Sequence, residues 1–100
     1  MSTLPDQAGQ EPPDELDGAE VILWAHSTDE PFLIMNYSNG IPYKAIHGFA
    51  VCRYRKSGQY YQFSCDNEWS VEGDFDEDSE EDAKQTAESQ TRPKVKWHRK

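Results

Sequence analysis

The chain has 100 residues, 35% of them hydrophobic, and carries 19 Asp and Glu against 10 Lys and Arg, a net charge of −9. This length favours one small domain, and an acidic surface repels phosphate backbones, which disfavours nucleic acid as the main partner. No stretch is apolar enough to cross a membrane or to serve as a secretion signal. Two cysteines without a CxxC motif fit a reducing, cytoplasmic setting.

Composition divides the chain into three parts. Residues 1–19 are rich in proline and acidic residues, with Leu4 and Leu16 as the larger apolar groups, so we expect this segment to be disordered. Residues 20–90 are predicted to form a single α+β domain. Residues 91–100 form a basic tail that is either an edge strand with guarding lysines or a mobile arm.

The first half of the predicted domain consists of strands. Residues 20–26 (EVILWAH) and 32–37 (FLIMNY) have continuous apolar runs, which indicate strands inside a sheet or covered on both faces. Asn39-Gly40 is a strong turn signal that leads into a third strand over residues 41–47, with Pro42 near its start. This register places Ile34 opposite Ala45 and Asn36 opposite Tyr43, and Phe32 opposite His47.

The clearest pattern is a β-hairpin over residues 49–65 with its turn at Ser57-Gly58. Such a turn places Cys52 opposite Phe63, although a different loop length would change the partners. Gly48, just before the hairpin, is expected to be a bulge or bend at which residues 43–55 continue as one strand or break into two. The alternation predicts a core face and an outward face. The core face carries Ala50, Cys52, Tyr54, Tyr61, Phe63 and Cys65, and the outward face carries Arg53, Arg55, Tyr60, Gln62 and Ser64.

After a turn at Asp66-Asn67, residues 68–72 (EWSVE) are predicted to form the last core strand, with Trp69 and Val71 buried. Ser79 then resembles the cap of a helix over residues 80–89, with Ala83 and Ala87 on its buried side. Phe75 is expected beneath the start of this helix. The fold class is therefore α+β, a small meandering antiparallel sheet of four to six strands with one C-terminal helix packed on it and a disordered N-terminus.

The acidic run from Asp74 partly matches the ligand spacing of a calcium-binding EF-hand loop. Asp74, Asp76 and Asp78 match the first, third and fifth ligand positions, but Ser79 replaces the turn glycine and Gln85 replaces the bidentate glutamate. We therefore expect no specific metal site and no cofactor.

Catalytic motifs are also missing from the sequence. His26, His47 and His98 belong to three different predicted elements, and His47 could meet Cys52 only if a bulge at Gly48 changed the face. No hydrolase, P-loop or dinucleotide-binding motif is present. We therefore expect a protein that is not an enzyme.

The outward face of the hairpin is the main candidate for binding, because arginine and aromatic side chains are enriched at interfaces. The face is either solvated, or bound to a partner, or paired internally with the acids of residues 74–82. The candidate partner surface consists of Arg53, Arg55, Tyr60, Gln62, Asp74, Asp76, Asp78 and Trp97.

These patterns predict a noncatalytic module that binds a protein with a basic surface, since an acidic surface attracts such a partner. An inhibitor-like or immunity-like protein is one form of this prediction. The alternative is a nucleic-acid-binding module that uses the Arg/Tyr face of the hairpin and the basic tail. No sequence feature identifies the partner or the oligomeric state.

Overall fold

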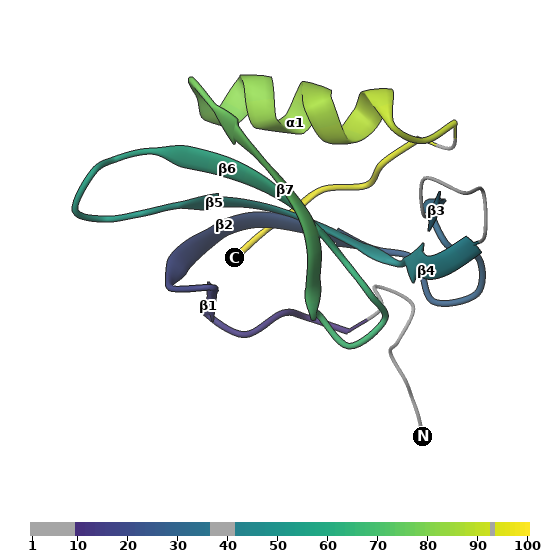
Figure 1. Cartoon of the computed structure of the whole chain (residues 1–100). Helices are drawn as coiled ribbons and strands as arrows, with labels where there is room; N and C mark the ends of the chain where they lie inside the picture. Colours follow the sequence, from purple (N-terminus) through teal and green to yellow (C-terminus); the bar gives the residue numbers. More distant parts are fainter. Residues whose placement is uncertain (1–9, 37–41, 93) are drawn as a thin grey trace.

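The computed structural model is dominated by a curled antiparallel sheet. A single helix packs on one face of this sheet (Figure 1). The structure describes residues 10–36, 42–92 and 94–100. In chain order its elements are β1 (Glu15–Leu16), β2 (Ala19–His26), β3 (Leu33–Asn36), β4 (Pro42–Ile46), β5 (Gly48–Arg53), β6 (Tyr60–Cys65), β7 (Val71–Glu77), α1 (Glu80–Ser89) and β8 (His98–Arg99). The predicted α+β class with an antiparallel sheet and a C-terminal helix is confirmed.

In the described part of the chain, the main sheet has six strands in the order β1-β2-β5-β6-β7, with β8 also paired to β2. Strands β3 and β4 form a separate two-stranded sheet. The sheet has two faces, which we name by what lies on them. The helix face carries α1, and the opposite face packs around Val21, Cys52, Phe63 and Trp69.

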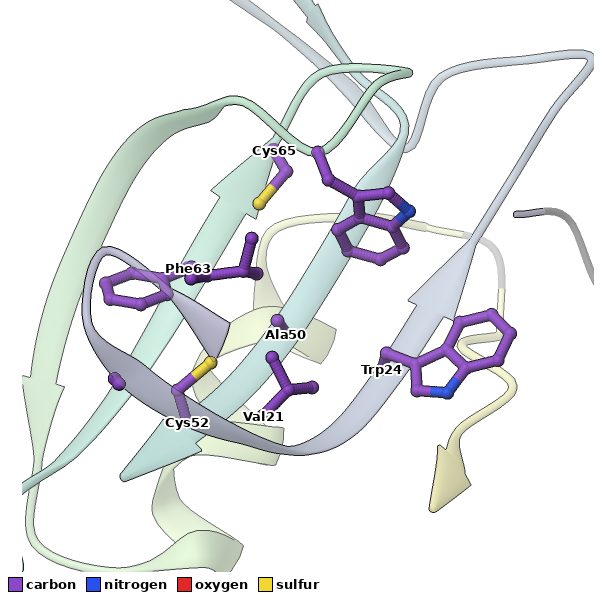
Figure 2. Packing of buried hydrophobic residues seen from close by; sticks show 9 residues of the cluster. Val21, Trp24, Ala50, Cys52, Phe63 and Cys65 are labelled. Carbon is purple, nitrogen blue, oxygen red and sulfur yellow. The ribbon is translucent and has the colours of Figure 1, made fainter. Parts of the chain in front are cut away.

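A bulge in β2 explains its continuous apolar sequence. Val21 lies opposite Cys52, but Leu23 lies opposite Val51, so the register shifts between them and the alternation of side chains changes. Val21 and Trp24 therefore pack together on the opposite face (Figure 2), whereas Leu23 packs with Val51 toward the helix. The prediction that this strand is covered on both faces is confirmed.

The β5–β6 hairpin has the predicted faces but a different register. Cys52 lies opposite Tyr61 rather than Phe63, a slip of two residues that leaves each side chain on its predicted face. The reason is a longer loop, in which Gly58 has a φ of 74° and donates its N–H to the Tyr54 carbonyl at 2.7 Å. Ala50, Cys52 and Phe63 lie together in the core as predicted (Figure 2).

The chain breaks into two strands at Gly48, which was one of the two predicted alternatives. Strand β4 ends at Ile46 and β5 begins at Gly48. A Cβ atom at Gly48 would lie 2.8 Å from the ring of Trp69, so only glycine allows the indole to pack this closely against the backbone.

The prediction that residues 32–37 lie within the sheet is wrong. Among the described strands β3 pairs with β4 alone, and Ile34 is 45% exposed. Ile34 lies opposite Ala45 as predicted, but a register shift places Asn36 opposite Pro42 instead of Tyr43. The predicted Asn39-Gly40 turn lies outside the described residues.

The predicted strand at residues 68–72 is also wrong in position. Trp69 is buried as predicted, yet it lies in a turn with a φ of 68°, where the Asp66 carboxylate accepts from the N–H groups of Glu68 and Ser70 at 2.8 and 2.9 Å. Because of this turn, β7 begins only at Val71. It then continues through the acidic residues to Glu77, because β6 pairs with it along its length.

The helix is confirmed over Glu80–Ser89. The Ser79 hydroxyl accepts from the Asp82 N–H at 3.0 Å, and Ala83 and Ala87 are fully buried. Phe75 lies on the helix face of the sheet but is 53% exposed, so it is not buried beneath the helix start as predicted.

The prediction of disorder over residues 1–19 is wrong for residues 10–19, and residues 1–9 lie outside the described part. Leu16 in β1 is only 6% exposed, the carbonyl of Asp14 accepts from Val21 N–H, and the carbonyl of Gln10 accepts from the Trp69 indole at 2.9 Å. Leu16 is buried along with Pro12 and Ala19, and backbone hydrogen bonds accompany these contacts. At the other end of the chain β8 pairs with β2, so the basic tail ends in an edge strand.

Candidate functional site

The predicted outward face of the hairpin is largely covered by the helix. Gln62 is fully buried, accepts from the Gln90 side-chain amide at 2.8 Å and donates to the Ser64 hydroxyl at 3.2 Å. The prediction that Gln62 is free for a partner is therefore wrong. The sequence pattern identified the face correctly but could not show that the polar residues on it meet the helix.

The two arginines of the hairpin have different environments. The Arg53 guanidinium lies 6.0 Å from the centre of the Tyr60 ring on the half-buried margin of the helix face. Arg55 is exposed and forms ion pairs with Glu20 at 3.4 Å and Glu15 at 3.8 Å. In the described part of the chain neither arginine forms an ion pair with the acids of residues 74–82, so the predicted internal pairing is wrong.

Trp97 is held within the fold. Its indole N–H donates to Glu88 at 2.8 Å, and its ring packs against the buried clusters around Val51 and Phe49. The interpretation of the tail as a mobile arm with a free Trp97 is therefore wrong.

Strand β7 places the acidic candidates on the surface. Asp74 and Asp76 are exposed on the strand, and Asp78 is exposed directly after it. None of the three forms an ion pair with a described residue. Phe75, between the first two, is 53% exposed. We call residues 74–78 the acidic edge.

The acidic edge lies at one side of the sheet. Strand β7 is the last strand in the order, and no described strand pairs with its outer side. The outer side of β2, at the far side of the sheet, is instead covered by β1 and then by β8 (Figure 1). In the described part of the chain, part of the outer side of β2 is therefore paired, whereas the outer side of β7 is open.

This open strand was not predicted over residues 74–77. Its signal was present, because Val71, Gly73 and Phe75 alternate with acidic residues at the period of a strand. The density of acids suggested a loop and a helix start instead.

Asp74 and Asp76 lie in an extended strand and not in a loop that wraps around an ion. No group of three or more His, Cys, Asp or Glu side chains suited to a metal occurs among the described residues.

Neither cysteine has the character of a nucleophile. Burial raises the pKa of the Cys52 thiol to about 12, and burial also raises the pKa of Cys65. Both groups are therefore protonated at neutral pH, whereas nucleophilic chemistry needs the thiolate. The His47 ring is engaged elsewhere, since its Nδ1 contacts the Ser27 carbonyl at 2.6 Å.

Two surface cavities are lined by residues outside the acidic edge. One of about 390 Å³ is lined by Glu15, Glu20 and Arg55, whose charges already pair with each other. Another of about 240 Å³ is lined by His26, Lys94 and other residues around Phe32. Neither places a nucleophile beside a base.

Comparison with protein-family models, curated proteins and solved structures finds no match for this chain. No helix in the described ranges has the length and apolar character needed to cross a membrane.

Proposed function

We propose that the protein is a noncatalytic binding module whose acidic edge engages a protein partner with a basic surface. The observation that carries the proposal is the exposure of Asp74, Asp76 and Asp78 without a cationic partner among the described residues. Uncompensated charges of one sign speed encounter with a complementary surface and select against like-charged partners.

The use of the other charges supports this proposal. Among the described residues, the cations that form ion pairs are Lys44, Arg55, Lys84, Arg99 and Lys100, and each pairs with an acid outside the acidic edge. The cations that form ion pairs in the described part of the chain thus leave the acidic edge without a cationic partner. A protein of the inhibitor or immunity type, which covers a basic site on its partner, is one form of this function.

The nucleic-acid alternative depended on the hairpin face. Because α1 covers Gln62 and Arg53 is half-buried, that face has little surface left for stacking bases. We therefore propose the acidic edge, and not the hairpin face, as the binding surface.

We also propose a reducing compartment such as the cytoplasm, which is supported by two buried thiols that are free. Alkylation of the protein as it is unfolded directly from cells should modify both cysteines, and recovery of a disulfide would contradict this proposal.

The binding proposal is tested by neutralising the acidic edge. The triple variant D74N/D76N/D78N should bind a labelled oligolysine peptide roughly tenfold more weakly than the unaltered chain, because three exposed charge pairs contribute about 0.5 kcal/mol each. Fluorescence anisotropy over a series of salt concentrations measures this loss.

A matched control separates the acidic edge from net charge. Asp29, Glu30 and Glu68 are exposed, form no ion pair among the described residues and lie in loops outside the acidic edge. The variant D29N/E30Q/E68Q changes the charge equally but should retain affinity within about twofold. Equal losses in the two variants would show that net charge alone attracts the peptide.

A further inference from the structure

We propose that the partner binds by adding an extended basic segment as a further strand beside β7. This inference rests on the proposed function and specifies how the acidic edge recognises its partner. In such strand addition, main-chain hydrogen bonds provide affinity and alternate side chains provide specificity.

The direction of the backbone groups follows from the β5–β6 hairpin. The N–H of Tyr54 donates to the carbonyl of Gln59 at 3.0 Å. The backbone N–H and C=O groups of Gln59, and of every second residue after it along β6, therefore point toward β5. Because backbone groups alternate in direction along an antiparallel strand, Tyr60 and its alternate residues point to β7.

Phe75 and Glu77 lie opposite these alternate residues and turn their backbone groups inward toward β6. The Glu77 carbonyl accepts from the Gln59 side-chain amide at 2.8 Å, in agreement with this direction. Asp74 and Asp76 therefore turn their N–H and C=O groups to the open side, as a template for another strand.

The side chains of the acidic edge define the chemistry of the added strand. Asp74 and Asp76 lie on the face of Phe63 and Tyr61, opposite the helix, whereas Phe75 projects from the helix face. An added strand would place alternate side chains beside the two carboxylates and the intervening one beside Phe75. The segment that fits best has a basic, apolar, basic sequence.

The charge of the edge also selects against one competing occupant. A second β7 would bring its own acids beside Asp74 and Asp76, and like charges on neighbouring strands repel. The Lys94–Lys96 segment of this chain has a basic, apolar, basic pattern, but Val95 is already buried against Ala25 and Phe49. The occupant we propose is therefore a segment of a different, basic protein.

Two peptides test strand addition directly. The probe is an acetylated, amidated peptide of alternating lysine and valine, and its partner is the same peptide N-methylated at every second amide, which keeps the charge but blocks strand pairing. The unmodified peptide should bind the full chain at low ionic strength, and the methylated peptide should bind roughly tenfold more weakly.

A pair of variants tests the same point on the protein. D76A removes one carboxylate but keeps the outward N–H, whereas D76P removes both, and proline is tolerated where a strand N–H faces solvent. D76P should bind the unmodified peptide roughly fivefold to tenfold more weakly than D76A. A thermal melt checks that D76P folds, and the peptide pair carries the test if it does not.

The outcomes distinguish this inference from the proposed function. Equal affinity for both peptides, with the loss in D74N/D76N/D78N intact, would overturn strand addition and leave a charge-based interface. No binding of any basic peptide at low ionic strength would overturn both. Self-association of the chain that D76P abolishes would identify a second copy as the occupant and overturn the choice of a different protein.

Discussion

Trp69 joins three distant parts of the chain through contacts of single residues. Its ring packs against the backbone at Gly48, meets Trp24 edge-on with centroids 6.2 Å apart, and its N–H donates to the Gln10 carbonyl. A buried indole usually requires a hydrogen-bond partner, and here the N-terminal segment provides it. This one side chain therefore helps to hold residues 10–19 against the sheet.

Because the two thiols are buried, the free energy of unfolding should decrease as the pH becomes alkaline. Burial raises the pKa of Cys52 from 9.0 in the unfolded chain to about 12 in the fold, so the folded state keeps a proton that the unfolded state loses. The stabilisation is complete below pH 9.0 and is lost as the pH rises toward about 12. Each thiol contributes a slope of at most about 1.4 kcal/mol per pH unit to the free energy of unfolding.

Urea unfolding at a series of alkaline pH values measures this slope. The double variant C52A/C65A should lose stability less steeply with pH than the unaltered chain, and parallel curves would contradict the assignment. If the double variant does not fold, a thiol reagent provides the second measurement. It should modify the native chain far more slowly than the chain in denaturant.

At the scale of elements, β1 is the least obvious part of the fold. It has two residues, yet it covers the start of β2 and buries Leu16 in the core cluster that includes Val21 and Trp69. Sequence composition alone indicated disorder, because one leucine among prolines and acids does not show a hydrophobic pattern. The segment is ordered by backbone hydrogen bonds, by ion pairs of its acids and by the burial of Leu16. These contacts depend on the tertiary fold, so composition does not reveal them.

Leu16→Ala tests the importance of β1. The substitution should lower the free energy of unfolding by about 2–4 kcal/mol, as expected for a buried leucine in a packed core. Glu15→Ala is the matched control on the same strand, and it should cost less than about 0.5 kcal/mol because its ion pair is exposed. Equal, small effects in urea unfolding would indicate a segment that does not contribute to the fold.

Where periodicity is strong, the elements could be predicted closely. The helix over Glu80–Ser89 and its Ser79 cap follow from local chemistry, and the two faces of the β5–β6 hairpin follow from strict alternation. The registers and the end of the sheet could not be predicted. They depend on loop length at Gly58 and on the Asp66 turn, where small backbone differences move a strand by two or more residues.

For the whole molecule, the structure places the predicted site residues in different environments, and their role in binding stays a prediction. Asp74, Asp76 and Asp78 are exposed as a binding surface requires, because solvation alone keeps dense charges at the surface. Gln62 and Trp97 could not be placed from the sequence, since their burial depends on where the helix and the tail pack. Strand β7 is open because of its position in the strand order. That order depends on contacts between residues far apart in the sequence.

The central claim is that the open side of β7 receives a basic strand, and residue-resolved amide hydrogen exchange tests it most directly. In the free protein, Asp74 and Asp76 amides should exchange rapidly, whereas those of Phe75 and Glu77 should be protected by β6. Addition of the lysine–valine peptide should protect Asp74 and Asp76 while leaving the exposed loop amides at Asp29 and Glu30 unchanged. Peptide binding that leaves both Asp74 and Asp76 amides in rapid exchange would contradict the account.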